Sequence, residues 1–183
     1  MPSIVYLVGP PASGKRTIGE ALSTLTGAAL VDNHLINDPI FRPYGADGIT
    51  PLPGWLWGLV QQVRDATLTA ARQAMPHVSH IFTNYLADEA SETAAVNELR
   101  DLAAHRSAQF LPVWLTCPPD ELLRRVALPD RERWHKMRDP EGLQRLIEDK
   151  GMLAPPADAL VLDTSILGPD EAARQINDQL AGS

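Results

Sequence analysis

A glycine-rich loop between an apolar stretch and a helix-forming stretch constrains this chain most. Residues 4–8 are four aliphatic residues and a tyrosine, which predict a buried strand, and residues 15–25 predict a helix. The loop that joins them has the sequence Gly-Pro-Pro-Ala-Ser-Gly-Lys-Arg-Thr over residues 9–17. Such a loop is typical of phosphate binding, because its backbone N–H groups and the helix N-terminus face the anion while the lysine reaches its outer oxygens.

The loop residues are candidate nucleotide-binding residues, and we expect ATP and Mg²⁺ as cofactors. Loops of this kind usually have Ser or Thr directly after the lysine, where the hydroxyl holds Mg²⁺. Here Arg16 stands at that position and the hydroxyl moves to Thr17, which either contacts a phosphate or reaches the metal itself. The candidate residues are Gly9, Ala12, Ser13, Gly14, Lys15, Arg16 and Thr17.

The bulk composition is that of one acidic globular domain spanning residues 1–183. A chain of 183 residues that is 44% hydrophobic is long enough to bury a core. Its net charge of −7 argues against a nucleic-acid partner. The apolar runs are strand-sized and the start of the chain has no basic signal segment, so we expect no membrane partner. With a single cysteine, Cys117, no intrachain disulfide forms, and we expect a cytoplasmic protein.

Strand-like and helix-like segments alternate along the chain, which predicts an α/β fold with a doubly wound parallel sheet. Residues 33–54 are rich in proline and glycine and are predicted to be irregular. Pro112 conflicts with an interior position in a strand at 110–115, so this strand is either bulged or begins at Val113. The other strands are predicted at 28–31, 78–83 and 159–162, and the other helices at 55–75, 88–105, 118–126, from 140 onward and at 169–180.

Ligands gather at the carboxyl ends of the strands in such sheets, so the residues there are candidates for chemistry. Asp32 follows the second strand and either accepts a proton from an attacking hydroxyl, holds Mg²⁺ together with Thr17, or caps a turn. His34 either binds substrate, orients Asp32 or is incidental. Asn84 offers a donor and an acceptor to a polar substrate, or satisfies loop backbone. The third strand ends without an acid, which favours transfer to a small acceptor over water activation for mechanical work.

A basic segment interrupts this acidic chain between residues 124 and 138. It holds six basic and two acidic residues, which indicates either one polyanionic ligand or a solvated helix face. The basic residues are Arg124, Arg125, Arg131, Arg133, Lys136 and Arg138.

Together these features resemble the small P-loop kinases, a superfamily that includes shikimate kinase, gluconate kinase, adenylate kinase and the chloramphenicol phosphotransferases. The similar features are the loop, Asp32, the stretch Thr-Cys-Pro-Pro-Asp-Glu-Leu-Leu-Arg-Arg-Val at 116–126 with the arginines after it, and Val-Leu-Asp-Thr-Ser at 161–165. The resemblance implies a three-layer α/β/α P-loop NTPase fold with a five-stranded parallel sheet in the order 2-3-1-4-5. It also implies a substrate-binding insert at 33–75 and a lid at 127–140.

The resemblance implies roles for the loop and for the second strand. Lys15 looks like the lysine that neutralises phosphate, and Thr17 matches the Gly-Lys-x-Thr variant of adenylate kinase. Asp32 is similar to the acid that contacts the acceptor hydroxyl in shikimate kinase. His34 replaces the second acid of that enzyme's Asp-x-Asp pattern, and its Gly-Gly-Gly stretch is missing here, so shikimate itself is not the expected acceptor.

Roles in the nucleotide pocket and the lid follow from the same resemblance. Arg125 resembles the arginine that packs on adenine, and the loop from Thr164 onward is expected to line the adenine pocket. Arg131 and Arg133 resemble lid arginines, with Arg131 as a candidate catalytic residue.

The insert offers two kinds of acceptor-binding side chain. Arg42 is suited to grip a carboxylate or phosphate, and Arg64 either does the same or is a solvated helix residue. Trp55 and Trp57 either stack on a ring of the acceptor or pack the domain.

The sequence therefore predicts an ATP-dependent phosphotransferase that moves the γ-phosphate to a hydroxyl or phosphate of a small molecule. A nucleoside monophosphate kinase and a nucleotide-binding regulatory protein without transfer activity are the alternatives. The predicted partner is the small-molecule acceptor, with the oligomeric state left open.

Overall fold

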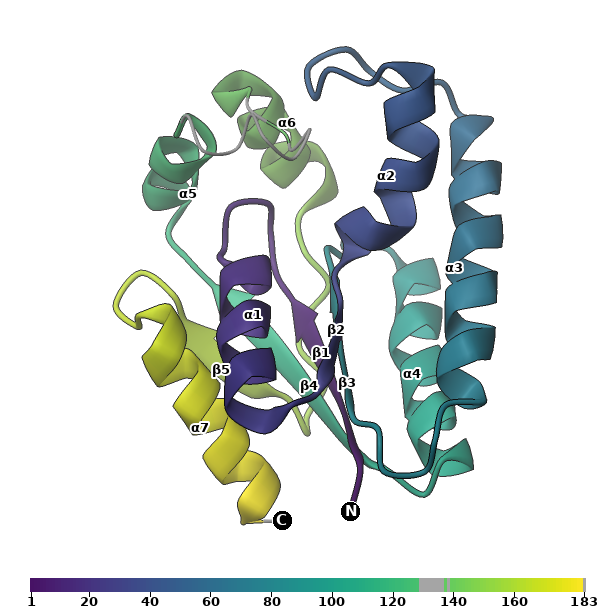
Figure 1. Cartoon of the computed structure of the whole chain (residues 1–183). Helices are drawn as coiled ribbons and strands as arrows, with labels where there is room; N and C mark the ends of the chain where they lie inside the picture. Colours follow the sequence, from purple (N-terminus) through teal and green to yellow (C-terminus); the bar gives the residue numbers. More distant parts are fainter. Residues whose placement is uncertain (129–136, 138, 183) are drawn as a thin grey trace.

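The computed structural model describes residues 1–128, 137 and 139–182 of the chain. A five-stranded parallel sheet forms its centre, with helices on both faces (Figure 1). The strands lie in the order β2-β3-β1-β4-β5, and every neighbouring pair runs parallel. The strand bounds are β1 Ser3–Val8, β2 Ala29–Val31, β3 His80–Asn84, β4 Gln109–Thr116 and β5 Leu160–Asp163. The expected fold class and strand order are thus confirmed.

Two pairs of helices cover the two faces of the sheet (Figure 1). Side chains that alternate along each strand fill the two cores, as expected for a sheet that is buried on both faces. In β1, Val5 and Leu7 pack toward helices α1 (Lys15–Thr26) and α7 (Pro169–Ala181). Residues Ile4, Tyr6 and Val8 pack on the opposite side, toward α3 (Leu56–Arg72) and α4 (Thr93–His105).

Three further helices lie beyond the carboxyl ends of the strands, where Figure 1 places them together. They are α2 (Asn33–Tyr44), α5 (Pro119–Val126) and α6 (Pro140–Lys150), and a short 3₁₀ turn, η1 (Ala90–Glu92), precedes α4. Helix α6 starts as its sequence predicts, because the Asp139 side chain accepts a hydrogen bond from the backbone N–H of Glu141. Residues of these three helices line the cavity above the phosphate loop.

The prediction of irregular structure at 33–54 is wrong for its first half, where α2 forms. Asp32 caps the helix by accepting a hydrogen bond from the backbone N–H of His34. Pro39 and Pro43 are four residues apart, so they lie on the same side of the helix, and both are exposed. The hydrogen bonds that the prolines remove are therefore lost on the solvent side, where water replaces them at little cost.

Pro112 lies inside a continuous β4, so neither a bulge nor a later start is needed. It pairs in register with Tyr6 of β1. On the other side of β4 the pairing with β5 begins only at Val113. Pro112 thus has a neighbouring strand on one side only, and a residue without an N–H group is tolerated there.

The helix expected at 55–75 is α3. Leu56, Val60 and Leu68 are buried, whereas Leu59 faces solvent. The helix expected at 88–105 starts later, as α4, after the 3₁₀ turn. Within the described residues, no helix combines the length and apolarity needed to cross a membrane.

Arg106 anchors the segment that leads from α3 into β3. Replacing Arg106 tests how much this anchor contributes to the stability of the fold. Its guanidinium donates hydrogen bonds to the backbone carbonyls of Ala71, Ala74, Met75 and Val78 at 2.8–3.0 Å. Replacing it with lysine keeps the charge but removes the planar fork, so we expect Arg106→Lys to lower the free energy of unfolding by about 2 kcal/mol. Urea unfolding followed by circular dichroism measures this.

The matched control is Arg174→Lys, because Arg174 pairs with Glu171 on the surface of α7 with both side chains more than 40% exposed. We expect little change there. An equal loss of stability in the two variants would contradict the anchoring role of Arg106.

Candidate active site

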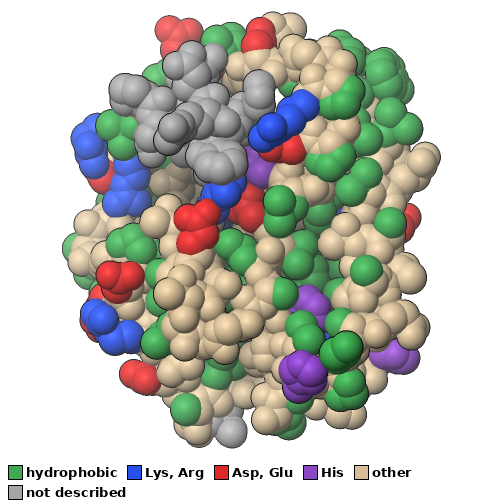
Figure 2. All heavy atoms as spheres, in the orientation of Figure 1, with side chains coloured by type: hydrophobic (Ala, Val, Ile, Leu, Met, Phe, Trp, Pro, Cys, Tyr) green, Lys and Arg blue, Asp and Glu red, His purple; other side chains and the backbone are tan. Residues whose placement is uncertain are grey.

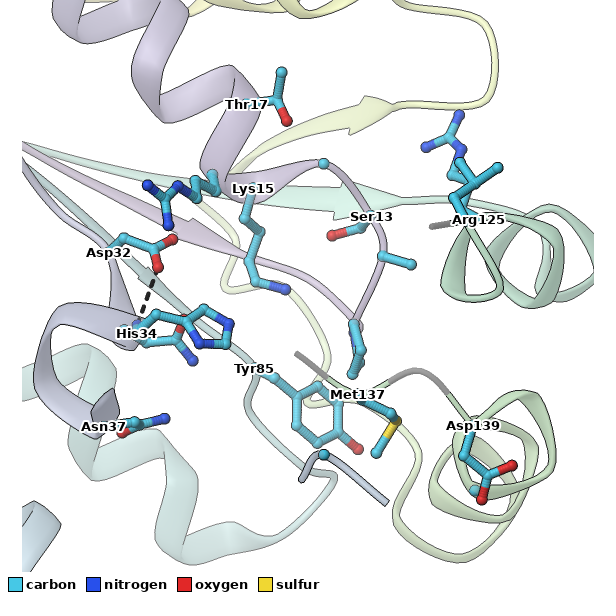
Figure 3. A pocket seen from close by; sticks show the side chains of 18 of the residues that line it. Ser13, Lys15, Thr17, Asp32, His34, Asn37, Tyr85, Arg125, Met137 and Asp139 are labelled. Atoms are coloured by element: carbon cyan, nitrogen blue, oxygen red, sulfur yellow. Dashed lines mark hydrogen bonds between the residues drawn. The ribbon is translucent and has the colours of Figure 1, made fainter. Parts of the chain in front are cut away.

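One cavity of about 970 Å³ opens at the carboxyl edge of the sheet (Figure 3). The phosphate loop and the start of α1 form its floor, and α5, α6 and the segment after β5 line one end. Helix α2, the segment 46–52 and Trp57 of α3 line the other end. This volume is at the upper end of the range for small-molecule sites, and it accommodates a nucleotide with a second small ligand.

The loop has the backbone shape that a phosphate cradle requires. Ala12 and Gly14 adopt positive φ angles of 68° and 88°, which turn the chain sharply into α1. The Lys15 ammonium donates hydrogen bonds to the carbonyl oxygens of Gly9 at 2.7 Å and Pro10 at 2.8 Å. Lys15 therefore lies across the loop, beside the space where a phosphate would bind.

Gly9 occupies a position where a larger residue has no room. Its N–H group donates to the carbonyl oxygen of Asn84, at the end of β3, at 3.2 Å. A Cβ atom at Gly9 would lie 2.7 Å from the Ser13 hydroxyl oxygen and 3.0 Å from both Cβ and the carbonyl oxygen of Leu115 in β4. The start of the loop is thus held between the ends of the two strands that flank β1.

Asp32 is buried and held by hydrogen bonds on both carboxylate oxygens. It is 3% exposed, and Oδ1 accepts from the backbone N–H of His34 at 3.0 Å. Oδ2 accepts from the Thr83 hydroxyl at 3.1 Å, and that hydroxyl accepts from the N–H of Asn33 at 3.0 Å. Because each carboxylate oxygen has a further lone pair, Asp32 both caps α2 and remains able to accept a proton or bind a cation. Asp32, Lys15 and His34 all line the cavity (Figure 3).

The donor atoms of the predicted metal site fit Mg²⁺. The carboxylate of Asp32 and the hydroxyl of Thr17 are oxygen ligands, which Mg²⁺ prefers, and both residues line the cavity. Thr17 lies away from Asp32 in Figure 3. The side chains of Lys15 and Thr17 diverge, since residues two apart on a helix point in nearly opposite directions. Among the described residues, no group of three or more His, Cys, Asp or Glu side chains is placed to hold a metal ion.

Arg125 and Thr164, both predicted near adenine, meet at the end of the cavity that α5 and the segment after β5 line. The Arg125 guanidinium donates to the carbonyl oxygen of Thr164 at 2.8 Å and to its hydroxyl at 3.4 Å. Thr164 in turn is tied to the end of β4, where its N–H donates to the carbonyl of Thr116 at 2.9 Å. Glu121 accepts hydrogen bonds from Arg124 and Arg125, which lower the pKa of its carboxyl group to about 2. These contacts hold the Arg125 side chain at the rim of the cavity.

Other predicted binding residues are not brought to the cavity. Arg42 points along the exposed side of α2, where it pairs with Asp38, and Arg64 pairs with Glu98 of α4. Neither arginine lines the cavity, so the prediction that they grip the acceptor is not supported.

Asn84 also lies outside the lining, and its side chain bonds to Tyr6 and to the backbone of Tyr85. Of the two roles predicted for Asn84, this is the one in which its side chain bonds to the loop backbone.

Arg131 and Arg133, together with most of the predicted lid, lie outside the described residues. Burial raises the pKa of the Cys117 thiol, which disfavours the reactive thiolate.

Several cavity residues were not predicted. Asn37 and Phe41 face the cavity from α2, at helical spacing from Asn33. The spacing can be seen in the sequence, but it indicates a shared helix face only if the segment is helical, and the sequence predicted a loop there. Tyr85 also lines the cavity and bonds to the carbonyl of Gly151, a contact between distant segments that the sequence does not reveal.

No protein-family model and no curated protein sequence matches the chain. Solved structures do match it. A sugar kinase from a Janibacter species has a TM-score of 0.61 at 17% identity, over 99% of this chain and 95% of the other. A gluconokinase from Sinorhizobium meliloti has a TM-score of 0.59 at 19% identity, over 99% and 93%. The APS kinase of Mycobacterium tuberculosis, in complex with AMPPNP and APS, has a TM-score of 0.53 at 20% identity, over 100% and 98%.

The chain has the fold of these kinases. The predicted resemblance to the small P-loop kinases is therefore confirmed at the level of the fold. The match spans nearly the full length of each kinase.

The tight fit at Gly9 predicts that one added methyl group disturbs the kinase-fold loop. We expect Gly9→Ala to weaken ATP binding about tenfold or more, because the loop must shift away from β4 to relieve the contacts. Isothermal titration with ATP measures the effect. Gly54→Ala is the matched control, since no atom lies within 4 Å of a Cβ at that position. Unchanged ATP affinity in Gly9→Ala would contradict the packing described for the loop.

Proposed function

We propose that the protein is a small-molecule kinase that transfers the γ-phosphate of ATP to a hydroxyl group of its acceptor. The observation that supports this most is the position of a buried carboxylate, Asp32, in the same cavity as Lys15 and the phosphate loop. A binding protein needs only the loop, whereas transfer to a hydroxyl needs an acceptor for the proton as well. The kinase fold supports the same proposal.

The donor side of the reaction depends on charge neutralisation. The triphosphate lies along the loop, where backbone N–H groups and the N-terminus of α1 bind its oxygens. The Lys15 ammonium leaves the carbonyls of Gly9 and Pro10 and pairs with the phosphate oxygens instead. Arg125 and Thr164 support the nucleoside end. Phosphoryl transfer requires little more than such positioning and charge stabilisation.

The acceptor side depends on Asp32. The acceptor hydroxyl attacks phosphorus in line, the bond from phosphorus to the ADP oxygen breaks, and the hydroxyl proton passes to an oxygen of Asp32. Asp32 and Thr17 are the residues with suitable oxygens for Mg²⁺, which when bound neutralises charge on the phosphates. The separation of Thr17 from Asp32 favours a phosphate contact for Thr17 over joint ligation of one ion with Asp32.

Variants of Lys15 and Asp32 separate nucleotide use from transfer. We expect Lys15→Ala to abolish ATP turnover, since the charge at the outer phosphates is lost. Asp32→Asn keeps most of the cap on α2, so we expect near-normal ATP binding but transfer slowed by roughly a hundredfold or more. ADP release in the presence of an acceptor, with ATP binding by titration, measures both effects. Normal phosphorylation by either variant would overturn the proposal.

Thr83 is a positioning residue for Asp32, because its hydroxyl connects the carboxylate to the start of α2. In Thr83→Val this hydroxyl is lost with little change of volume. We expect kcat to fall about tenfold with an unchanged KM for ATP, because the carboxylate is no longer held at one oxygen. Thr83→Ser keeps the hydroxyl and is expected to restore kcat. A valine variant with wild-type kcat, or a serine variant as slow as valine, would contradict this role.

A further inference from the structure

The acceptor end of the cavity has an apolar wall. Phe41 of α2 and Trp57 of α3 meet there edge to face, with ring centroids 5.5 Å apart and an angle of 88° between the rings. Ile49, Pro51 and Leu52 of the segment between these helices line the same end. Hydrophobic side chains gather over α2 and α3 at the upper right of Figure 2.

Much of this apolar surface is exposed to water in the absence of a ligand. Trp57 is 51% exposed and Ile49 is 60% exposed, although both line the cavity. Covering apolar surface with an apolar ligand is favourable in proportion to the area removed from water. An indole next to a phenyl ring is, in addition, suited to contact with another ring.

The helices α2 and α3 and the segment between them bring no arginine to the cavity. The structure describes all of residues 33–75, and the arginines of this range, Arg42, Arg64 and Arg72, do not line the cavity. Arg42 and Arg64 are both paired with acids outside it. The described lysines and arginines that line the cavity come from the loop, α1, α5 and α6. Proteins usually bind carboxylates and phosphates with arginine or lysine, so this wall does not suit an anionic acceptor.

The polar groups at this end suit an uncharged ligand. Asn37 offers an amide that both donates and accepts hydrogen bonds, and it lies near His34 and Asp32 in Figure 3. A hydroxyl near Asp32 would therefore have the Asn37 amide on the same side of the cavity and apolar rings beyond it.

We propose that the acceptor is an uncharged hydroxyl compound with an apolar ring, which binds against Phe41 and Trp57 and presents its hydroxyl to Asp32. This inference rests on the proposed kinase function and names the substrate class of that site. It excludes nucleoside monophosphates and sugar acids as preferred acceptors.

The first test compares acceptors in matched pairs that differ by one charged group. Adenosine and uridine are paired with their 5′-monophosphates, and 1-phenyl-1,2-ethanediol is paired with mandelate, while gluconate and shikimate serve as further anionic probes. ADP release above the rate without acceptor is measured for each. We expect kcat/KM to be at least about tenfold higher for the neutral member of each pair.

The outcomes of this test separate the two proposals. Higher kcat/KM for the charged members would overturn the inference while leaving the kinase function intact. Transfer to none of the compounds would overturn both.

The second test uses the two neighbouring tryptophans. Trp57→Ala removes the indole from the cavity, and we expect the KM for the neutral acceptor to rise about tenfold with an unchanged KM for ATP. Trp57→Phe keeps a ring and is expected to restore most of the affinity. Trp55→Ala is the control, because Trp55 is 62% exposed, packs edge to face on Tyr44 and lies outside the cavity lining.

Folding of each variant is checked by thermal unfolding. An unchanged acceptor KM in Trp57→Ala, or equal increases in the variants of Trp55 and Trp57, would overturn the inference.

Discussion

The architecture of this site depends on the close packing of Gly9 between the ends of β3 and β4. Strand β1 lies between these two strands, and the loop leaves it where a Cβ atom would collide with Leu115. The N–H group of Gly9 donates to the carbonyl oxygen of Asn84 in β3, and with the loop held there the N-terminus of α1 and the Lys15 side chain line the cavity. The surrounding helices then complete a site whose floor is set by the central strand.

Asp32 links the fold of the acceptor region to its chemistry. The same carboxylate begins α2 and lines the cavity beside the phosphate loop. Helix α2 therefore starts at Asp32, the proposed proton acceptor, and extends to the aromatic contact between Phe41 and Trp57. Among the described residues, the lysine and arginines that line the cavity come from the loop, α1, α5 and α6, whereas α2, α3 and the segment between them contribute none. This division supports transfer of phosphate from an anionic donor to an uncharged acceptor.

The loop, the alternation of strands and helices and the carboxylate after β2 could all be predicted, because each is a local pattern. The meeting of Arg125 with Thr164 followed from resemblance to a known family. Helix α2 was missed because its prolines indicate loop structure until the exposed side of the helix is known. Arg42 was assigned to the acceptor because its pairing with Asp38 needs the helix α2, which the sequence did not predict. Arg64 was assigned there because its pairing with Glu98 depends on tertiary packing. For the same reason only the structure distinguishes Trp57, at the cavity, from its neighbour on the surface.

The most direct test of the account follows the phosphoryl group itself. ATP labelled with ¹⁸O on its γ-phosphoryl oxygens is incubated with the protein, Mg²⁺ and a neutral ring-bearing alcohol such as 1-phenyl-1,2-ethanediol, and the products are analysed by mass spectrometry. The account predicts a phosphorylated alcohol in which the labelled oxygens surround phosphorus and the bridging oxygen comes from the alcohol. Label found only in inorganic phosphate would contradict it, because water rather than the alcohol would then be the acceptor.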